Sequence, residues 1–142
     1  MKYFAYGSNM YSCEIVTTLD IKPEIIGVIK LTGYKFAYNK ESSRDHSGKA
    51  NIYPYSNVYV CGVIYEVSEE LMKLIDAKEG GYNKINIVLP LDGKNVKAVT
   101  YTAKPERIDD MLQPTDDYRS KIIKGAVENK LPTSYIEQFL EK

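Results

Sequence analysis

Runs of apolar and β-branched residues predict about six β-strands along the chain. The clearest lies at 58–67, where valine, isoleucine and tyrosine crowd into ten residues, a composition typical of strands. A turn at 92–94, Asp-Gly-Lys, joins the last two predicted strands into a hairpin. The other predicted strands lie at 2–5, 25–31, 34–38, 85–91 and 96–102.

Helices are predicted where apolar residues recur at helical spacing behind a capping residue. The best defined begins after Ser68, carries Glu69 and Glu70 in its first turn, and ends at Gly80-Gly81. Three more complete the set: one at roughly 9–19 with a serine or asparagine cap, one starting at 114–117, and a short one from Pro132.

This order of elements favours an α+β fold rather than strict strand–helix alternation. A small mixed β-barrel with flanking helices is a natural way to bury so many strands. A chain of 142 residues fits one domain, which we expect to span residues 1–142. The polar stretch 39–49 predicts a mobile surface loop, with a role as a lid left open.

Charge and composition narrow the classes of function. The chain has 19 basic and 19 acidic residues, mixed along its length, so we expect no nucleic-acid partner. No apolar run is long enough for a signal peptide or a membrane span, so we expect a cytoplasmic protein with no membrane partner. Cys13 and Cys61 lie far apart, which predicts reduced thiols rather than a disulfide or a zinc site.

The first candidate for chemistry is the segment Tyr6-Gly7-Ser8-Asn9. A strand that turns through glycine into a helix exposes several backbone N–H groups, which suit a carboxylate or an oxyanion. An ordinary helix cap has the same composition, so the segment is a weak signal when taken alone.

The second candidate is Glu79, at the end of the predicted helix. A carboxylate is unfavourable at the negative end of a helix dipole, and partial burial would raise its pKa toward that of a general base at neutral pH. The alternative is an exposed glutamate beside Lys78. His46 is the only histidine and lies in the polar stretch, so a serine or cysteine relay is not expected.

Taken together, these segments resemble the γ-glutamylcyclotransferase-like family. The opening Tyr3-Phe4-Ala5-Tyr6-Gly7-Ser8-Asn9-Met10 is similar to the signature of that family. The segments 62–65 and 74–80 are similar to its central strand and catalytic-glutamate segment, and 118–123 and 125–132 to its C-terminal helices. The similarity therefore runs in order over nearly the whole chain.

The resemblance implies a mixed barrel that converts a small-molecule γ-glutamyl substrate to 5-oxoproline and a free amino acid, as in glutathione metabolism. It implies no cofactor and no metal. Glu79 would be the general acid/base, and Tyr82, two glycines further on, would be a pocket tyrosine. The remaining substrate-binding residues would be Tyr3, Phe4, Ala5, Tyr6, Gly7, Ser8, Asn9 and Tyr118.

Several alternatives stay open at this point. The same chemistry could act on γ-glutamyl amines or on a carrier-bound γ-glutamyl intermediate. A non-catalytic binding protein of the same fold is a reading from a different class. The sequence also leaves open whether the protein forms a homodimer.

Overall fold

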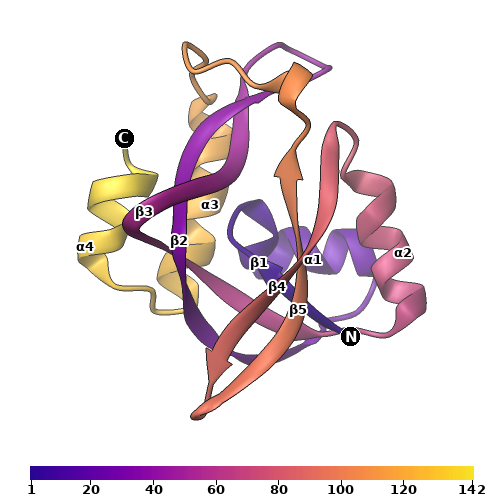
Figure 1. Ribbon diagram of the computed structural model, residues 1–142. Coiled ribbons are helices and arrows are strands. Elements are labelled where there is room, and N and C mark those ends of the chain that lie inside the picture. The colour runs from indigo at the N-terminus through magenta and orange to yellow at the C-terminus, as the bar shows by residue number, and fades with distance from the viewer.

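The computed structural model describes residues 1–142 and contains one five-stranded sheet in the order β2-β3-β1-β5-β4 (Figure 1). The short strand β1 lies at the centre, antiparallel to β3 and parallel to β5. The other neighbouring strands pair as antiparallel hairpins. The strands are β1 Lys2–Ala5, β2 Glu24–Glu41, β3 Gly48–Glu66, β4 Tyr82–Leu91 and β5 Lys94–Ala103.

Helices flank this sheet on two sides. In Figure 1, α3 and α4 lie beside the β2–β3 hairpin, and α1 and α2 lie on the other side of the molecule. The α+β fold class predicted from the sequence is therefore confirmed. The helices are η1 Ser8–Met10, α1 Ser12–Leu19, α2 Glu69–Lys78, η2 Pro105–Arg107, α3 Asp116–Glu128 and α4 Thr133–Tyr135, which continues as the π-helical turn η3 Ile136–Leu140.

The predicted barrel describes the sheet only loosely, because the sheet is open. β2 and β4 are its edges: among the strands, β2 pairs only with β3 and β4 only with β5, and β2 adds one isolated bridge from Lys40 to Ile108. The ladder between β2 and β3 is long and strongly bent, so the sheet curves without closing (Figure 1).

The β2–β3 hairpin differs most from the sequence prediction. Two expected strands at 25–31 and 34–38 form one continuous strand, because Gly33, at φ 87°, makes a bulge instead of a turn. The prediction of a mobile loop at 39–49 is also wrong at both ends of that range, because Lys40 and Lys49 are paired strand residues. The turn itself is confined to residues between Glu41 and Gly48.

Local signals set the remaining helix boundaries. The Ser68 and Thr115 side chains accept hydrogen bonds from the N–H groups of Leu71 and Tyr118, and so cap α2 and α3. The helix predicted at 9–19 is split, because Tyr11 is extended between η1 and α1, and no side chain caps either helix. None of the helices has the length and apolar character that a membrane crossing requires.

Candidate active site

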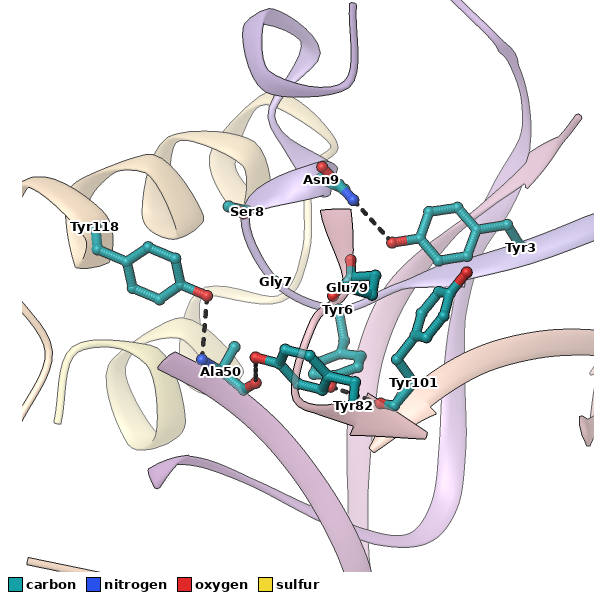
Figure 2. A pocket seen from close by; sticks show the side chains of 10 residues that line it. All are labelled: Tyr3, Tyr6, Gly7, Ser8, Asn9, Ala50, Glu79, Tyr82, Tyr101 and Tyr118. Carbon is teal, nitrogen blue, oxygen red and sulfur yellow. Dashed lines mark hydrogen bonds between the residues drawn. The ribbon is translucent and has the colours of Figure 1, made fainter. Parts of the chain in front are cut away.

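Eight of the ten site residues predicted from the sequence line a single pocket (Figure 2). The pocket lies where the end of β1 meets the end of α2, with α3 and the β2–β3 hairpin beside it. Its lining residues are Tyr3, Tyr6, Gly7, Ser8, Asn9, Ala50, Glu79, Tyr82, Tyr101 and Tyr118.

The segment after β1 offers unused backbone donors to this pocket. The N–H groups of Gly7, Ser8 and Asn9 donate no hydrogen bond within the protein. A methyl group at Gly7 would stand 3.1 Å from the Ala50 Cβ, so glycine leaves room there. The pocket wall therefore carries three consecutive N–H groups that can bind an oxyanion or a carboxylate.

The same segment is held in place by buried side chains. The Tyr65 hydroxyl donates to the Asn9 carbonyl at 2.7 Å, and the Asn9 amide donates to the Tyr3 hydroxyl at 3.0 Å. The Tyr6 hydroxyl donates to the Tyr101 carbonyl at 2.7 Å, which ties the segment to β5. The three donors are thus fixed before any ligand arrives.

Helix α3 supports the segment from behind. The Asn129 amide donates to the Met10 carbonyl at 2.8 Å, and Gly125 packs directly on the backbone of η1. A methyl group at Gly125 would lie 2.5 Å from the Tyr11 nitrogen. Glu128 accepts hydrogen bonds from the N–H and the hydroxyl of Ser12, at 2.9 and 2.7 Å.

Glu79 is the residue directly after α2, and its carboxyl group lies at the centre of the pocket (Figure 2). Burial raises the pKa of this carboxyl from its usual 4.5 to about 7. The Lys40 ammonium lowers this pKa and the Asp76 carboxylate raises it, both by smaller amounts. At neutral pH the group can therefore both accept and release a proton.

A second carboxylate stands one turn earlier on α2. Asp76 accepts a short hydrogen bond from the Tyr101 hydroxyl and contacts the Lys84 ammonium at 3.1 Å. Tyr101 lines the pocket, and Lys84 lies on β4. This chain of contacts fixes the end of α2, and with it Glu79, against the β4–β5 hairpin.

Two pocket tyrosines share the backbone of Ala50. The Tyr82 hydroxyl donates to the Ala50 carbonyl at 2.6 Å, and the Ala50 N–H donates to the Tyr118 hydroxyl at 3.1 Å (Figure 2). The hydroxyl hydrogen of Tyr118 therefore remains free to donate to a ligand.

Phe4 and Ala5 do not line the pocket, contrary to the prediction. Side chains alternate along a strand, so Phe4 points away from Tyr3 and packs on Gly62 in the core. Ala5 carries only a methyl group, and it is buried. The sequence prediction also missed Ala50 and Tyr101, which reach the pocket only through strand pairing that no local motif indicates.

The pocket suits proton transfer combined with stabilisation of a negative charge. It holds one carboxyl group that titrates near neutral pH, three unused N–H donors and several phenol groups. Nowhere in the chain do three histidine, cysteine, aspartate or glutamate side chains gather as a set of metal ligands.

Comparison with known proteins identifies the class. A model described as the AIG2-like family matches residues 59–139, which is more than half of the chain. The chain therefore belongs to the AIG2-like family.

Its relatives include named enzymes. The γ-glutamylcyclotransferase of Mus musculus is 27% identical over 145 residues, covering 96% of this chain and 75% of the relative. The Homo sapiens enzyme of the same name is 26% identical with the same coverage. A solved structure named γ-glutamyl cyclotransferase superposes with a TM-score of 0.87 at 26% identity, over 99% of this chain and 85% of that one.

Proposed function

We propose that this chain is a γ-glutamylcyclotransferase that releases 5-oxoproline from γ-glutamyl amino acids or dipeptides, with Glu79 as general acid/base. The observation that carries the proposal is a single carboxyl group, with a pKa of about 7, in the same pocket as three unused N–H donors. The named activity of the mouse and human relatives supports it.

The substrate brings its own nucleophile. The α-amine of the γ-glutamyl group attacks the γ-carbonyl carbon and closes a five-membered ring, so the chain needs no serine or cysteine nucleophile. The amine is an ammonium ion at pH 7 and must first lose a proton. Glu79 accepts that proton because its pKa of about 7 leaves much of the carboxyl ionised at this pH.

Breakdown of the tetrahedral intermediate completes the reaction. The bond between the γ-carbon and the leaving nitrogen breaks as Glu79 returns its proton to that nitrogen. The ring nitrogen loses its second excess proton, which passes by way of the Glu79 carboxylate to the departing amine, so the amine leaves as an ammonium ion. The products are 5-oxoproline and a free amine, and the glutamate is again ionised. No atom is gained from solvent, which distinguishes the reaction from hydrolysis to glutamate.

The segment 7–9 binds negative charge in this mechanism. Its free N–H groups serve either the oxyanion on the former γ-carbonyl or the substrate α-carboxylate. Tyr118 has a free hydroxyl hydrogen and Tyr3 a hydroxyl that accepts from Asn9, so both phenols can donate to the substrate.

We further propose that the protein acts in the cytoplasm. Cys13 is exposed and Cys61 is buried, and neither forms a disulfide. Unpaired cysteines are typical of a reducing compartment.

The proposal is tested by incubating the purified protein with γ-glutamyl amino acids and measuring 5-oxoproline. Wild type should release it, and Glu79→Gln should lose at least about a hundredfold in kcat, the usual size of a general acid/base contribution. Glu70→Gln is the matched control, because Glu70 is exposed on the same helix and lies outside the pocket.

Each other outcome has a definite meaning. Full activity of Glu79→Gln would remove the glutamate from the mechanism. Free glutamate in place of 5-oxoproline would make the protein a hydrolase. Binding of γ-glutamyl compounds without any product would make it a binding protein of the same fold.

A further inference from the structure

The pocket opens into a wider cleft. The two share Ser8, Asn9, Glu79, Tyr82 and Tyr118, so the cleft begins at the proposed acid/base. The leaving group is bonded to the carbon that reacts beside Glu79. Once the γ-glutamyl part fills the inner pocket, the leaving group extends into this cleft.

The cleft is strongly cationic. Five basic side chains line it, against two carboxylates. One of those carboxylates, Glu14, is already paired with Lys121 at 2.8 Å. None of the other four basic side chains has a carboxylate within 4.0 Å: these are Lys40, Arg44, Lys49 and Lys78.

Two of these cations face each other. Lys40 on β2 is paired directly with Lys49 on β3. Like charges opposite each other in a ladder are destabilising, so the arrangement weakens the empty protein. We call Lys40 and Lys49 the lysine pair.

Both members of the lysine pair are partly withdrawn from water. Lys40 is only 6% exposed as a whole residue, and Lys49 is half-buried. Burial is the largest cause that lowers the pKa of both lysines. At Lys40 the Arg107 cation lowers the pKa further and the Glu79 carboxylate raises it by less. At Lys49 the Asp45 carboxylate raises the pKa and the Lys121 cation lowers it by less. Neither ammonium has a carboxylate within 4.0 Å to offset this loss of solvation.

The pocket tyrosines hold the lysine pair at the mouth of the inner pocket. The Lys40 ammonium lies 4.9 Å from the ring centroid of Tyr82, and the Lys49 ammonium lies 4.0 Å from that of Tyr118. Gly81 leaves space for the first of them, since a methyl group there would stand 2.7 Å from the Lys40 Cε.

We propose that this cleft selects γ-glutamyl compounds whose leaving group is an acidic amino acid, with two carboxylates. The inference rests on the proposed function and names its substrate class. A neutral amino acid supplies one carboxylate to two unpaired ammonium groups, and a dicarboxylic one supplies a partner for each. A γ-glutamyl amine supplies none, and a leaving group with an added cation is repelled.

The test compares two substrates of the same shape. γ-Glutamyl-glutamate and γ-glutamyl-glutamine differ by one charge on the leaving group. We expect kcat/KM for 5-oxoproline release to be about tenfold higher for γ-glutamyl-glutamate, mostly through KM, because the extra contact exists before the reaction begins. Equal values for the two substrates would overturn the inference.

Charge removal should erase this preference. Lys49→Gln is expected to bring the ratio of the two kcat/KM values close to one. The matched control is Lys73→Gln, an exposed lysine on α2 outside the cleft, which should keep the ratio. A preference that survives in Lys49→Gln would mean that another group selects the substrate.

A third measurement uses the wild-type protein alone and varies the salt concentration. Raising the ionic strength to about 0.5 M should reduce the preference, because salt screens charges at a cleft open to water.

The proposed function and the proposed substrate selection are contradicted by different results. No 5-oxoproline from any γ-glutamyl compound would reject the proposed function, whereas release at equal rates from both substrates would reject only the selection.

Discussion

The raised pKa of Glu79 follows from its place in the chain. The residue follows the last turn of α2, where carbonyl groups and the Asp76 carboxylate disfavour a second negative charge. Burial is the largest cause and the Lys40 ammonium opposes it, so that the pKa moves from 4.5 to about 7. The burial that makes ionisation of Glu79 unfavourable in the fold is therefore also what suits it to the proposed role as general acid/base.

This pKa predicts the pH dependence of the rate. The proposed base must be ionised, so kcat/KM should rise with pH and level off above about pH 7. Asp76→Asn should move the midpoint to lower pH, because the Asp76 charge raises the pKa of Glu79. Initial rates of 5-oxoproline release between pH 5 and pH 9 measure both. A profile that is flat through pH 7 would contradict the assignment.

The same group should make stability depend on pH. Its pKa is higher in the folded chain than in the unfolded one, so the folded state loses stability as pH rises from 4.5 to about 7. The loss amounts to about 3 kcal/mol above pH 7. Glu79→Gln should therefore be more stable than wild type at pH 8, with little difference at pH 5.

Urea unfolding at the two pH values measures this difference. Glu70→Gln again serves as the control, because Glu70 is exposed and its substitution should leave the difference between the two pH values as in wild type. A Glu79→Gln protein that is no more stable than wild type at pH 8 would mean that the carboxylate is not destabilised in the fold.

Tyr118 is predicted to bind rather than to transfer protons. Its ring is buried in the pocket wall, and its pKa is raised, chiefly by burial, so the phenol stays protonated. Tyr118→Phe should raise KM several-fold more than it lowers kcat, since a donor to the ground-state substrate is lost. Steady-state kinetics with one γ-glutamyl amino acid distinguishes the two roles. A fall in kcat with KM unchanged would mean that Tyr118 takes part in the chemical step.

Among the secondary-structure elements, α3 has the clearest indirect role. Gly125 lets α3 touch the backbone of η1, and the donors at 7–9 are the N-cap and the first two residues of that turn. Gly125→Ala should destabilise the fold by about 1–3 kcal/mol despite the better helix propensity of alanine, because the new methyl group meets backbone atoms. It should also lower kcat/KM by displacing the donors.

Lys124→Ala is the matched control for this change. The neighbouring residue is exposed on the same helix, so the substitution tests helix propensity without the contact. Denaturant unfolding and the rate of 5-oxoproline release are measured for both variants. If Gly125→Ala were as stable and as active as Lys124→Ala, η1 would be able to shift away from the new methyl group without loss of stability or activity.

The elements also show what the sequence could predict. The caps at Ser68 and Thr115 and the turn at Asp92-Gly93 act within a few residues, so their signals are local and the elements follow them. Gly33 was interpreted as a turn, although the long ladder with β3 makes it a bulge. That outcome depends on pairing partners about 20 residues away, which a local pattern does not specify.

For the site, residues in continuous motifs could be predicted and residues supplied by pairing could not. The 6–9 segment and Glu79 stand in recognisable sequence contexts, and both reach the pocket. Ala50 reaches it through the pairing of β3 with β2, and Tyr101 through the pairing of β5 with β1. The lysine pair was hidden for the same reason, since 39–49 was interpreted as a loop.

At the scale of the whole molecule, the pocket is built from distant segments. β1, β3, β4, β5, η1, α3 and the end of α2 each supply a lining residue or border one. A ligand bound there should therefore stabilise the fold as a unit. For Glu79→Gln with a γ-glutamyl amino acid at about 100 times its Kd, the expected gain is about 2.7 kcal/mol.

Thermal unfolding with and without the ligand measures this gain, and hydrogen exchange locates it. Protection should increase in η1, in β3 near Ala50 and in α3 together. Protection confined to one of these segments would mean that the pocket does not act as one unit.

The lysine pair and Glu79 come from separate parts of the chain, the outer end of the β2–β3 hairpin and the end of α2. Substitutions at position 49 can therefore change which compounds are used while the reacting groups stay as they are, whereas loss of the charge at position 40 would also raise the pKa of Glu79. In descent from a common ancestor, this separation lets duplicated genes acquire new substrates without passing through an inactive intermediate. The outer end of one hairpin would then be the part of this fold that diverges fastest among active relatives.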